Sequence, residues 1–189
     1  MKIYFVASVA GKNKLLREYQ LIVDYLKELG HQVEQNTLDA TVDEIQGLSD
    51  SDKTNFYKKT VALIQASDLI VAEVSHASLG VGHEISLALE KSKPVVVLHN
   101  GTGATHLLEG MQSEKMVVMD YELATLKSIL SEAVDFAKDQ IDTRFNFFIA
   151  PRHANYLDWI SKQNKMPRSA YLRTLIKKDL QENPDYNKA

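Results

Sequence analysis

The sequence predicts an α/β protein whose main part is a parallel sheet with helices on both faces, followed by a small strand–helix–helix unit. Nearly continuous apolar runs alternate with segments of helical periodicity, which is typical of buried parallel strands joined by helices. This alternation stops near residue 144. The charge changes at the same point: thirteen Lys/Arg and twenty-one Asp/Glu precede it, whereas nine and four follow, so the net charge goes from −8 to +5.

The first half of the predicted sheet follows from three patterns. Residues 2–8, KIYFVAS, form an apolar run that predicts a buried strand. Apolar side chains then recur every three or four residues over 13–29, which predicts a helix that ends at Gly30. A short strand over 31–36 and a loosely amphipathic helix over 52–66 follow.

The second half of the predicted sheet repeats this order. Residues 67–74, SDLIVAEV, are almost all apolar and give the clearest strand pattern of the chain. A helix over 79–92 and a buried strand over 93–100 come next. A fifth strand over 115–121 and a helix over 122–139 complete the α/β part.

The last segment predicts a different kind of structure. Residues 144–151, RFNFFIAP, alternate as a single strand, and apolar stripes predict helices over 153–165 and 167–181. A unit of about 40 residues cannot bury a sizeable core alone. We therefore expect it to dock on a partner, with a frayed tail over 183–189.

Composition excludes several classes of function. The 189 residues include no cysteine, which excludes disulfides, thiolate nucleophiles and cysteine zinc sites. No apolar run has the length of a membrane span, and the N-terminus lacks a signal-peptide pattern, so we expect a cytoplasmic protein without membrane contact. The chain has no G-x-G-x-x-G or P-loop motif, and its six histidines lack metal-ligand spacing. We therefore expect no cofactor and no metal.

A candidate site lies in the segment SHASLGVGHE, which follows the third predicted strand. Ligands of parallel sheets bind beyond the carboxyl ends of the strands. Glycines at 80 and 82 allow close approach of a ligand, and Ser78 can cap a helix or donate to a phosphate. Glu84 has two open interpretations: a nucleophile at an anomeric carbon, or a first-turn partner of the helix dipole stabilising by about 0.3–1 kcal/mol.

The longer segment SDLIVAEVSHASLGVGHEISLALEKSKPVVVL (67–98) resembles the core of the nucleoside 2-deoxyribosyltransferase superfamily. It is most similar to the branch of 2'-deoxynucleoside 5'-phosphate N-hydrolases. With the weaker similarity of KIYFVASVAGK, the resemblance extends over 1–140. It implies a flavodoxin-like, doubly wound sheet of five parallel strands, a homodimer with shared sites, and cleavage of an N-glycosidic bond.

The resemblance also implies roles for individual residues. The family nucleophile corresponds to Glu84, and its phosphate-contacting residues correspond to Ser78 and Gly80. Serine rather than aspartate at position 78 favours a 5'-monophosphate substrate. His83 replaces a tyrosine of the branch and either stacks on a substrate ring or lies on the helix surface. A hydroxyl that the family takes from the partner subunit corresponds to Thr105.

The first predicted loop departs from the family pattern. The segment FVASVAGK keeps Ser8 and Gly11 as substrate-binding candidates. Ala10 stands where the family has an arginine that neutralises phosphate. Lys12 or Lys14 would have to replace it, although lysine supplies charge without a bidentate fork.

A second departure concerns proton transfer to the leaving base. Thr60 stands where the family has an aspartate, and loss of a general acid or base costs about 10²–10⁴-fold in rate. Asp50, Asp52 or Glu73 would have to compensate. For Glu73 and Asp68, however, the sequence favours hydrogen bonding at the strand ends.

The C-terminal segment 144–180 resembles the ribbon-helix-helix family, whose members are obligate dimers with a two-stranded ribbon. The resemblance places Arg144, Asn146 and Phe148 on the outward strand face, where DNA-binding members read bases. It places Arg168 and Ser169 at a helix start, where a phosphate can bind. DNA binding and dimerisation without DNA both stay open.

The sequence therefore predicts two domains, 1–140 and 144–182. The leading hypothesis is hydrolysis or transfer at the N-glycosidic bond of 2'-deoxynucleoside 5'-monophosphates. The alternative is a nucleotide-sensing DNA-binding regulator with a weak or inactive site. The expected partners are a nucleotide or deoxynucleoside monophosphate, further copies of the chain in a homodimer or higher oligomer, and DNA if the basic unit binds it.

Overall fold

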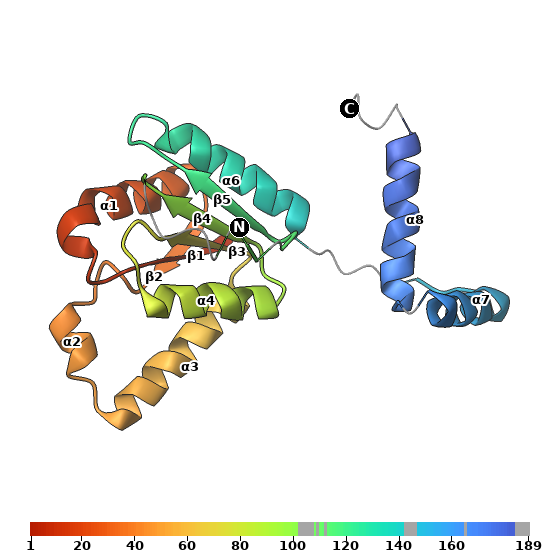
Figure 1. The fold of residues 1–189 in the computed structure, drawn as a ribbon, viewed down its shortest axis with the longest axis horizontal. Helices are drawn as coiled ribbons and strands as arrows, with labels where there is room; N and C mark the ends of the chain where they lie inside the picture. The colour runs from red at the N-terminus through yellow and green to blue at the C-terminus, as the bar shows by residue number, and fades with distance from the viewer. Residues whose placement is uncertain (102–107, 109, 112, 142–146, 165, 184–189) are drawn as a thin grey trace. The chain divides into compact units, whose positions relative to one another are not determined.

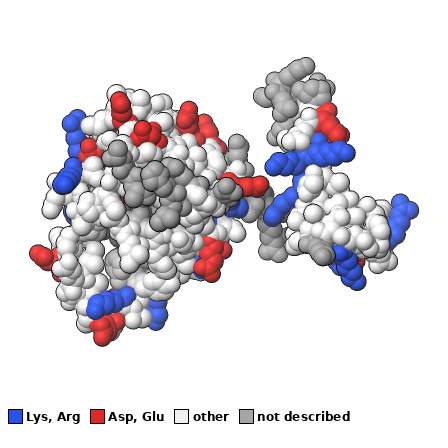
Figure 2. All heavy atoms as spheres, in the orientation of Figure 1, with Lys and Arg blue, Asp and Glu red and all other residues white. Residues whose placement is uncertain are grey.

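The computed structural model describes residues 1–101, 108, 110–111, 113–141, 147–164 and 166–183. The chain divides into two compact units, Met1–Asp142 and Thr143–Ala189. The division falls at the predicted change of pattern and charge. Lysine and arginine side chains are prominent on the visible face of the second unit, whereas both signs are interspersed on that of the first (Figure 2).

The N-terminal unit is built on one parallel sheet. Its strands are β1 (Lys2–Ala7), β2 (Gln32–Gln35), β3 (Leu69–Glu73), β4 (Val95–His99) and β5 (Met116–Asp120). Their order is β2-β1-β3-β4-β5, and every neighbouring pair is parallel. This is the flavodoxin-like order, so the predicted five-stranded parallel sheet is confirmed. The order switches between β1 and β3, and such folds bind ligands beyond this point.

Helices cover both faces of the sheet (Figure 1). α1 (Lys12–Glu28) and α6 (Leu126–Gln140) pack on one face, and α3 (Asp50–Ala66) and α4 (Leu79–Glu90) pack on the other. Because side chains alternate along a strand, Ile3 and Phe5 of β1 enter the first core, whereas Tyr4 and Val6 enter the second. Tyr4 is thereby placed on the face that α4 covers.

One helix, α2 (Val42–Gln46), was not predicted. Thr41 caps it by accepting a hydrogen bond from the Glu44 amide, and the Glu44 carboxylate accepts from the Thr41 amide in return, so that both partners of a capping box are present. The sequence T-x-x-E carries this pattern, but the helix is too short to show apolar periodicity. The helix matters for the site because α2 and the start of α3 form one wall of the cavity described below.

The C-terminal unit contains two helices, α7 (Pro151–Gln163) and α8 (Arg168–Glu182). The predicted strand 144–151 is not present in its described part: residues 147–150 form no strand, and α7 begins at Pro151. Proline is favoured in the first turn of a helix, which explains the earlier helix start. A strand also needs a neighbouring strand for its hydrogen bonds. Arg144 and Asn146 lie outside the described residues.

This unit leaves most of its apolar side chains exposed. In the described part of the unit, Leu157 is the only buried residue. The exposed large apolar residues are Phe147, Phe148, Ile149, Tyr156, Trp159, Leu175, Ile176 and Leu180. The Tyr156 ring is tilted against that of Trp159, with 5.9 Å between ring centroids, and its hydroxyl lies 3.3 Å from that of Tyr171. Among the helices that the structure describes, none is long and apolar enough to cross a membrane.

Candidate active site

A cavity of about 320 Å³ lies at the carboxyl end of β1, between α2, α3 and the start of α4. β1 and its following loop supply Tyr4 and residues 6–10, and α4 with its cap supplies Ser78, Gly80, Val81 and Glu84. The remaining lining residues are Asn36, Thr37, Ala40, Val42, Ile45, Gln46 and Phe56. The lining is mostly apolar with a few polar groups, which is the usual character of a small-molecule site.

Glu84 supplies the only carboxylate among these lining residues. Tyr4 donates a hydrogen bond from its hydroxyl to Glu84 Oε2 at 2.9 Å. Burial raises the pKa of Glu84 from its ordinary value of 4.5 to about 7, although the bond from Tyr4 opposes this change. Burial and the neighbouring Glu84 charge raise the pKa of Tyr4, so the tyrosine stays a neutral donor. Glu84 is therefore poised between its acid and its nucleophilic form near neutral pH.

The position of Glu84 in α4 weakens its interpretation as a dipole partner. Ser78 is the N-cap, and the first turn of α4 contains no acidic residue. Glu84 is the sixth residue of the helix, whereas the dipole effect falls off within the first turn. The first-turn placement that the sequence predicted was therefore wrong by one turn. Of the two interpretations of Glu84, its observed position in α4 supports the one in which the carboxylate faces the cavity.

Ser78 and Gly80 both line the cavity, as the resemblance implied. The Ser78 hydroxyl accepts a hydrogen bond from the Val81 amide at 3.5 Å and so caps α4. A Cβ atom added at Gly80 would meet only Ser78 Oγ, at 3.8 Å. This position therefore keeps open space at the start of α4 for a ligand.

Ser8 lines the cavity, but Gly11 does not. A Cβ atom at Gly11 would lie 2.6 Å from His76 Cβ and 2.7 Å from the Tyr19 hydroxyl. Gly11 is thus required for packing of the first loop against the loop after β3, and the structure gives no support to its predicted substrate contact.

The two lysines expected to replace an arginine at Ala10 do not line the cavity. Lys12 donates from Nζ to the carbonyl oxygens of Leu38 at 2.8 Å and Ala40 at 2.6 Å. It therefore fastens the start of α1 to the cavity wall. Lys14 is exposed. Ala10 itself lines the cavity without any charge.

His83 lies outside this cavity on the exposed side of α4. Its ring stacks on Tyr57 of α3, with 6.0 Å between ring centroids. It borders a neighbouring groove together with Leu79, Gly82 and Leu108. Of its two open interpretations, this position supports the helix-surface histidine. Thr105 lies outside the described residues.

Thr60 occupies the aspartate position implied by the resemblance. It is 4% exposed and lies close to Tyr4, and its hydroxyl has no hydrogen-bond partner among the described residues. Asp50 pairs with Lys53 at 3.1 Å, and Asp52 bonds to the Ser49 hydroxyl that caps α3. Neither aspartate lines the cavity, so neither replaces the missing acid there.

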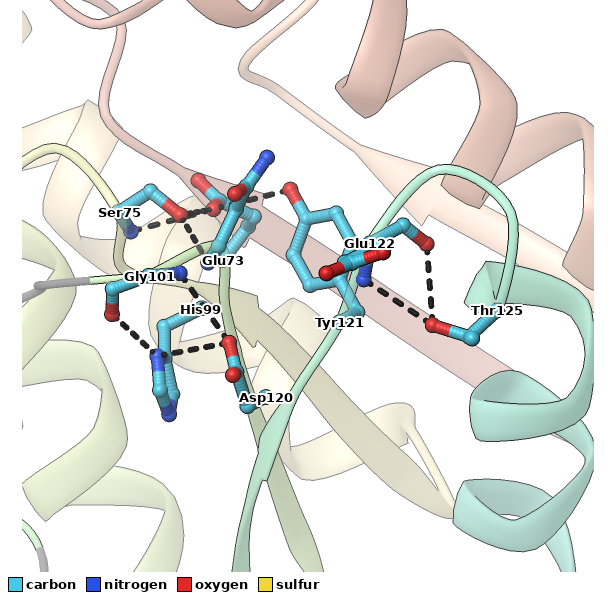
Figure 3. A network of polar contacts seen from close by, with 9 residues as sticks. Glu73, Ser75, His99, Gly101, Asp120, Tyr121, Glu122 and Thr125 are labelled. Atoms are coloured by element: carbon cyan, nitrogen blue, oxygen red, sulfur yellow. Dashed lines mark hydrogen bonds and ion pairs between the residues drawn. The ribbon is translucent and has the colours of Figure 1, made fainter.

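Glu73 ends β3 on the opposite face of the sheet and is fully buried. Its Oε1 atom accepts hydrogen bonds from the amide and hydroxyl of Ser75 and from the Tyr121 hydroxyl at 3.2 Å (Figure 3). The Ser75 hydroxyl accepts from the Asn100 amide at 2.7 Å. Burial raises the pKa of Glu73, and these bonds oppose the rise. The carboxylate ties the ends of β3, β4 and β5 together, in agreement with the strand-end interpretation.

Asp68 likewise bonds to backbone rather than to the cavity, since the Lys2 amide donates to its Oδ2 at 2.7 Å. It precedes β3 and so lies at the start of the strand instead of its end. Within the described part of the chain, no group of three or more His, Cys, Asp or Glu side chains is arranged to hold a metal.

Comparison with known proteins identifies the family of the chain. The family model for nucleoside 2-deoxyribosyltransferase matches residues 3–128. The chain belongs to this family. A candidate 2'-deoxynucleoside 5'-phosphate N-hydrolase of Methanococcoides burtonii is 33% identical over 100 residues, which are 52% of this chain and 80% of the relative.

Two further comparisons extend over more of this nucleoside 2-deoxyribosyltransferase family member. The 5-hydroxymethyl-dUMP N-hydrolase of Danio rerio is 29% identical over 136 residues, 70% of this chain and 94% of the relative. The CMP N-glycosidase BcmB of Clostridium botulinum superimposes with a TM-score of 0.48 at 19% identity, over 71% of this chain and 98% of that one. The family match and the sequence relatives confirm the predicted resemblance to the hydrolase branch, and the chain is an enzyme of the N-glycosidase type.

Proposed function

We propose that the protein cleaves the N-glycosidic bond of 2'-deoxynucleoside 5'-monophosphates, with Glu84 as the nucleophile. The observation that carries this proposal is the single carboxylate of the cavity, which Tyr4 orients at 2.9 Å and whose pKa is raised to about 7. The names of the relatives support nucleotide substrates.

The chemistry proceeds in two displacements. The ionised Glu84 attacks C1' of the sugar through Oε1, because Tyr4 holds Oε2. A glycosyl ester forms while the C1'–N bond breaks, and the electron pair of that bond leaves with the base, which takes up a proton. Water then attacks C1', the ester bond breaks, and the carboxylate is restored as the water loses a proton. A second base in place of water would give transfer.

The phosphate end of the substrate is assigned to the start of α4. Ser78, Gly80 and Ser8 line that part of the cavity, and helix starts favour anions because their amides are unpaired. The mostly apolar wall that includes Ile45 and Phe56 is assigned to the base. Thr60 supplies no proton at neutral pH, so the leaving base takes its proton from water or from another group.

The test is incubation of the full chain with each deoxynucleoside monophosphate, followed by chromatography for free base. Glu84→Gln should lose at least 10³-fold in rate, the order expected when a nucleophile is removed. Glu90→Gln, on the exposed side of the same helix, is the matched control and should keep full activity. Absence of base release, or equal release by Glu84→Gln, would contradict the proposal and favour the regulator with an inactive site. Addition of a second free base distinguishes hydrolysis from transfer.

We also propose that the C-terminal unit joins two chains into a homodimer and binds DNA. Its exposed apolar side chains, with Leu157 alone buried among the described ones, support a partner of similar character. Its net charge of +5 supports a polyanion. Phe148 is fully exposed and available to a base methyl group, whereas Arg168 already pairs with Asp158. Ser169 stands beside it at the start of α8.

Two measurements test this second proposal. Light scattering of the full chain should give the mass of a dimer or higher oligomer, and Leu175→Glu with Ile176→Glu should reduce it. A gel shift at 50 and 200 mM salt should show retardation that Arg144→Ala with Asn146→Ala weakens. A monomeric full chain would contradict dimerisation, and retardation unchanged by the double substitution would contradict DNA contact through residues 144 and 146.

A further inference from the structure

The cavity presents an electrostatic problem for the substrate proposed above, and the inference below rests on that proposal. Its described lining contains one carboxylate, Glu84, and no lysine, arginine or histidine. A phosphate monoester brings close to two negative charges at neutral pH. The phosphate oxygens therefore need strong hydrogen-bond donors on or just behind the cavity lining, because burying an anion without partners costs free energy.

His76 stands directly behind one lining residue. It lies in the loop between β3 and α4 and is half-buried, and its Nδ1 atom is 3.0 Å from Ser8 Oγ. The same Oγ accepts a hydrogen bond from the Gly11 amide at 3.2 Å. Ser8 is 3% exposed and lines the cavity. The histidine thus reaches the cavity through one hydroxyl group.

The hydrogen-bond count of Ser8 decides what this contact does. A hydroxyl has one proton to donate and two lone pairs to accept with. If Nδ1 of His76 lacks a proton, Ser8 donates its only proton to that atom and has none for a ligand. If Nδ1 carries a proton, it and the Gly11 amide fill both lone pairs. The Ser8 proton is then free to point into the cavity.

The surrounding contacts hold His76 and Ser8 together. The missing Cβ of Gly11 makes room for the histidine, since an added Cβ would lie 2.6 Å from His76 Cβ and 2.9 Å from its Cγ. The Tyr19 hydroxyl donates to the Ser8 carbonyl oxygen at 3.3 Å. The loops after β1 and β3 are therefore joined at the point where the strand order switches.

We propose that His76 is a positioning residue for the phosphate of the substrate: its Nδ1–H donates to Ser8 Oγ and turns the Ser8 hydroxyl proton onto a phosphate oxygen. This role makes His76 a determinant of the preference for a nucleotide over the corresponding nucleoside. His76 takes no part in the bond cleavage at Glu84.

The experiment measures affinity, so that its result does not depend on turnover. Glu84→Gln serves as the background, and calorimetry gives the Kd of a deoxynucleoside monophosphate and of the matching deoxynucleoside. His76→Leu should raise the Kd of the monophosphate about tenfold or more, the order for a hydrogen bond to a charged group, and change the nucleoside Kd less than about twofold. His76→Asn should retain most of the affinity, because its amide donates from nearly the same place as Nδ1.

A double-mutant cycle completes the test. Ser8→Ala should show the same selective loss, and His76→Leu added to it should cost little more, because both changes remove one interaction. Losses that multiply, or equal losses for nucleotide and nucleoside, would overturn the proposal. Equal Kd values of the Glu84→Gln background for nucleotide and nucleoside would overturn it as well. If Glu84 were not the nucleophile, the ratio of these two Kd values would still be the same, so the two proposals can fail separately. Denaturation curves of each variant identify any that fail to fold, and His76→Asn then provides the comparison.

Discussion

Replacement of Glu84 by glutamine should stabilise the folded protein at alkaline pH while it abolishes base release. Burial raises the pKa of this carboxyl in the folded chain from 4.5 to about 7. Between these two values the unfolded chain loses its proton first, so ionisation favours the unfolded state. Stability of the natural protein therefore falls as pH rises from 4.5 to 7. A glutamine, which never ionises, escapes this loss.

The size of the effect follows from the same two values. At about 1.36 kcal/mol for each pH unit between 4.5 and 7, the penalty approaches about 3 kcal/mol at pH 8. At pH 5, only about half a unit above the unfolded-state value, little of this penalty has built up, and the difference should be below about 1 kcal/mol. The amide oxygen of glutamine still accepts from Tyr4, so the change removes charge with little loss of contacts.

Urea denaturation at pH 5 and pH 8 checks this prediction. Far-UV circular dichroism is the suitable probe, because the single tryptophan, Trp159, lies in the C-terminal unit. The exposed Glu90→Gln on the same helix should change stability by less than about 0.5 kcal/mol at either pH. A Glu84→Gln protein no more stable than the natural one at pH 8, or a gap that is equal at both values, would refute the buried-carboxylate reasoning.

Three further substitutions, one of them paired with a control, test the site and its surroundings. Tyr4→Phe removes the bond that lowers the pKa of Glu84, so the rising limb of the pH–rate profile, expected near pH 7, should move to higher pH. Gly11→Ala should destabilise by about 1–3 kcal/mol in denaturation experiments, since its Cβ would collide with neighbouring side chains, whereas Gly82→Ala, in open space, should be neutral or stabilising. Thr60→Val removes a buried hydroxyl without a described partner, and should stabilise by up to about 1 kcal/mol in the same assay.

The sheet could be predicted because each of its buried strands leaves its own apolar run in the sequence. Strands buried on both faces must be apolar throughout, and the runs in β1, β3 and β4 show this directly. The helix α2 escaped prediction because its five residues are too few for a periodic pattern. The strand over 144–151 was predicted from alternation alone, which fixes no hydrogen-bond partner.

The site was predictable in part for a similar reason. Glu84, Ser78 and Gly80 belong to one continuous segment, so the resemblance found them together. Tyr4 was missed because its partner is 80 residues away and meets it only through the pairing of β1 with β3. Lys12 looked available for phosphate, but the carbonyl oxygens that hold it come from a distant loop.

The buried Glu73 network has a consequence for engineering of this protein. It fixes three strand ends from the face of the sheet that lies away from the cavity, and none of its members lines the cavity. The wall that carries Asn36, Gln46 and Phe56 belongs to other segments. Libraries of variants confined to Gln46 and Phe56 should therefore test the proposed base contacts while the strand ends stay fixed.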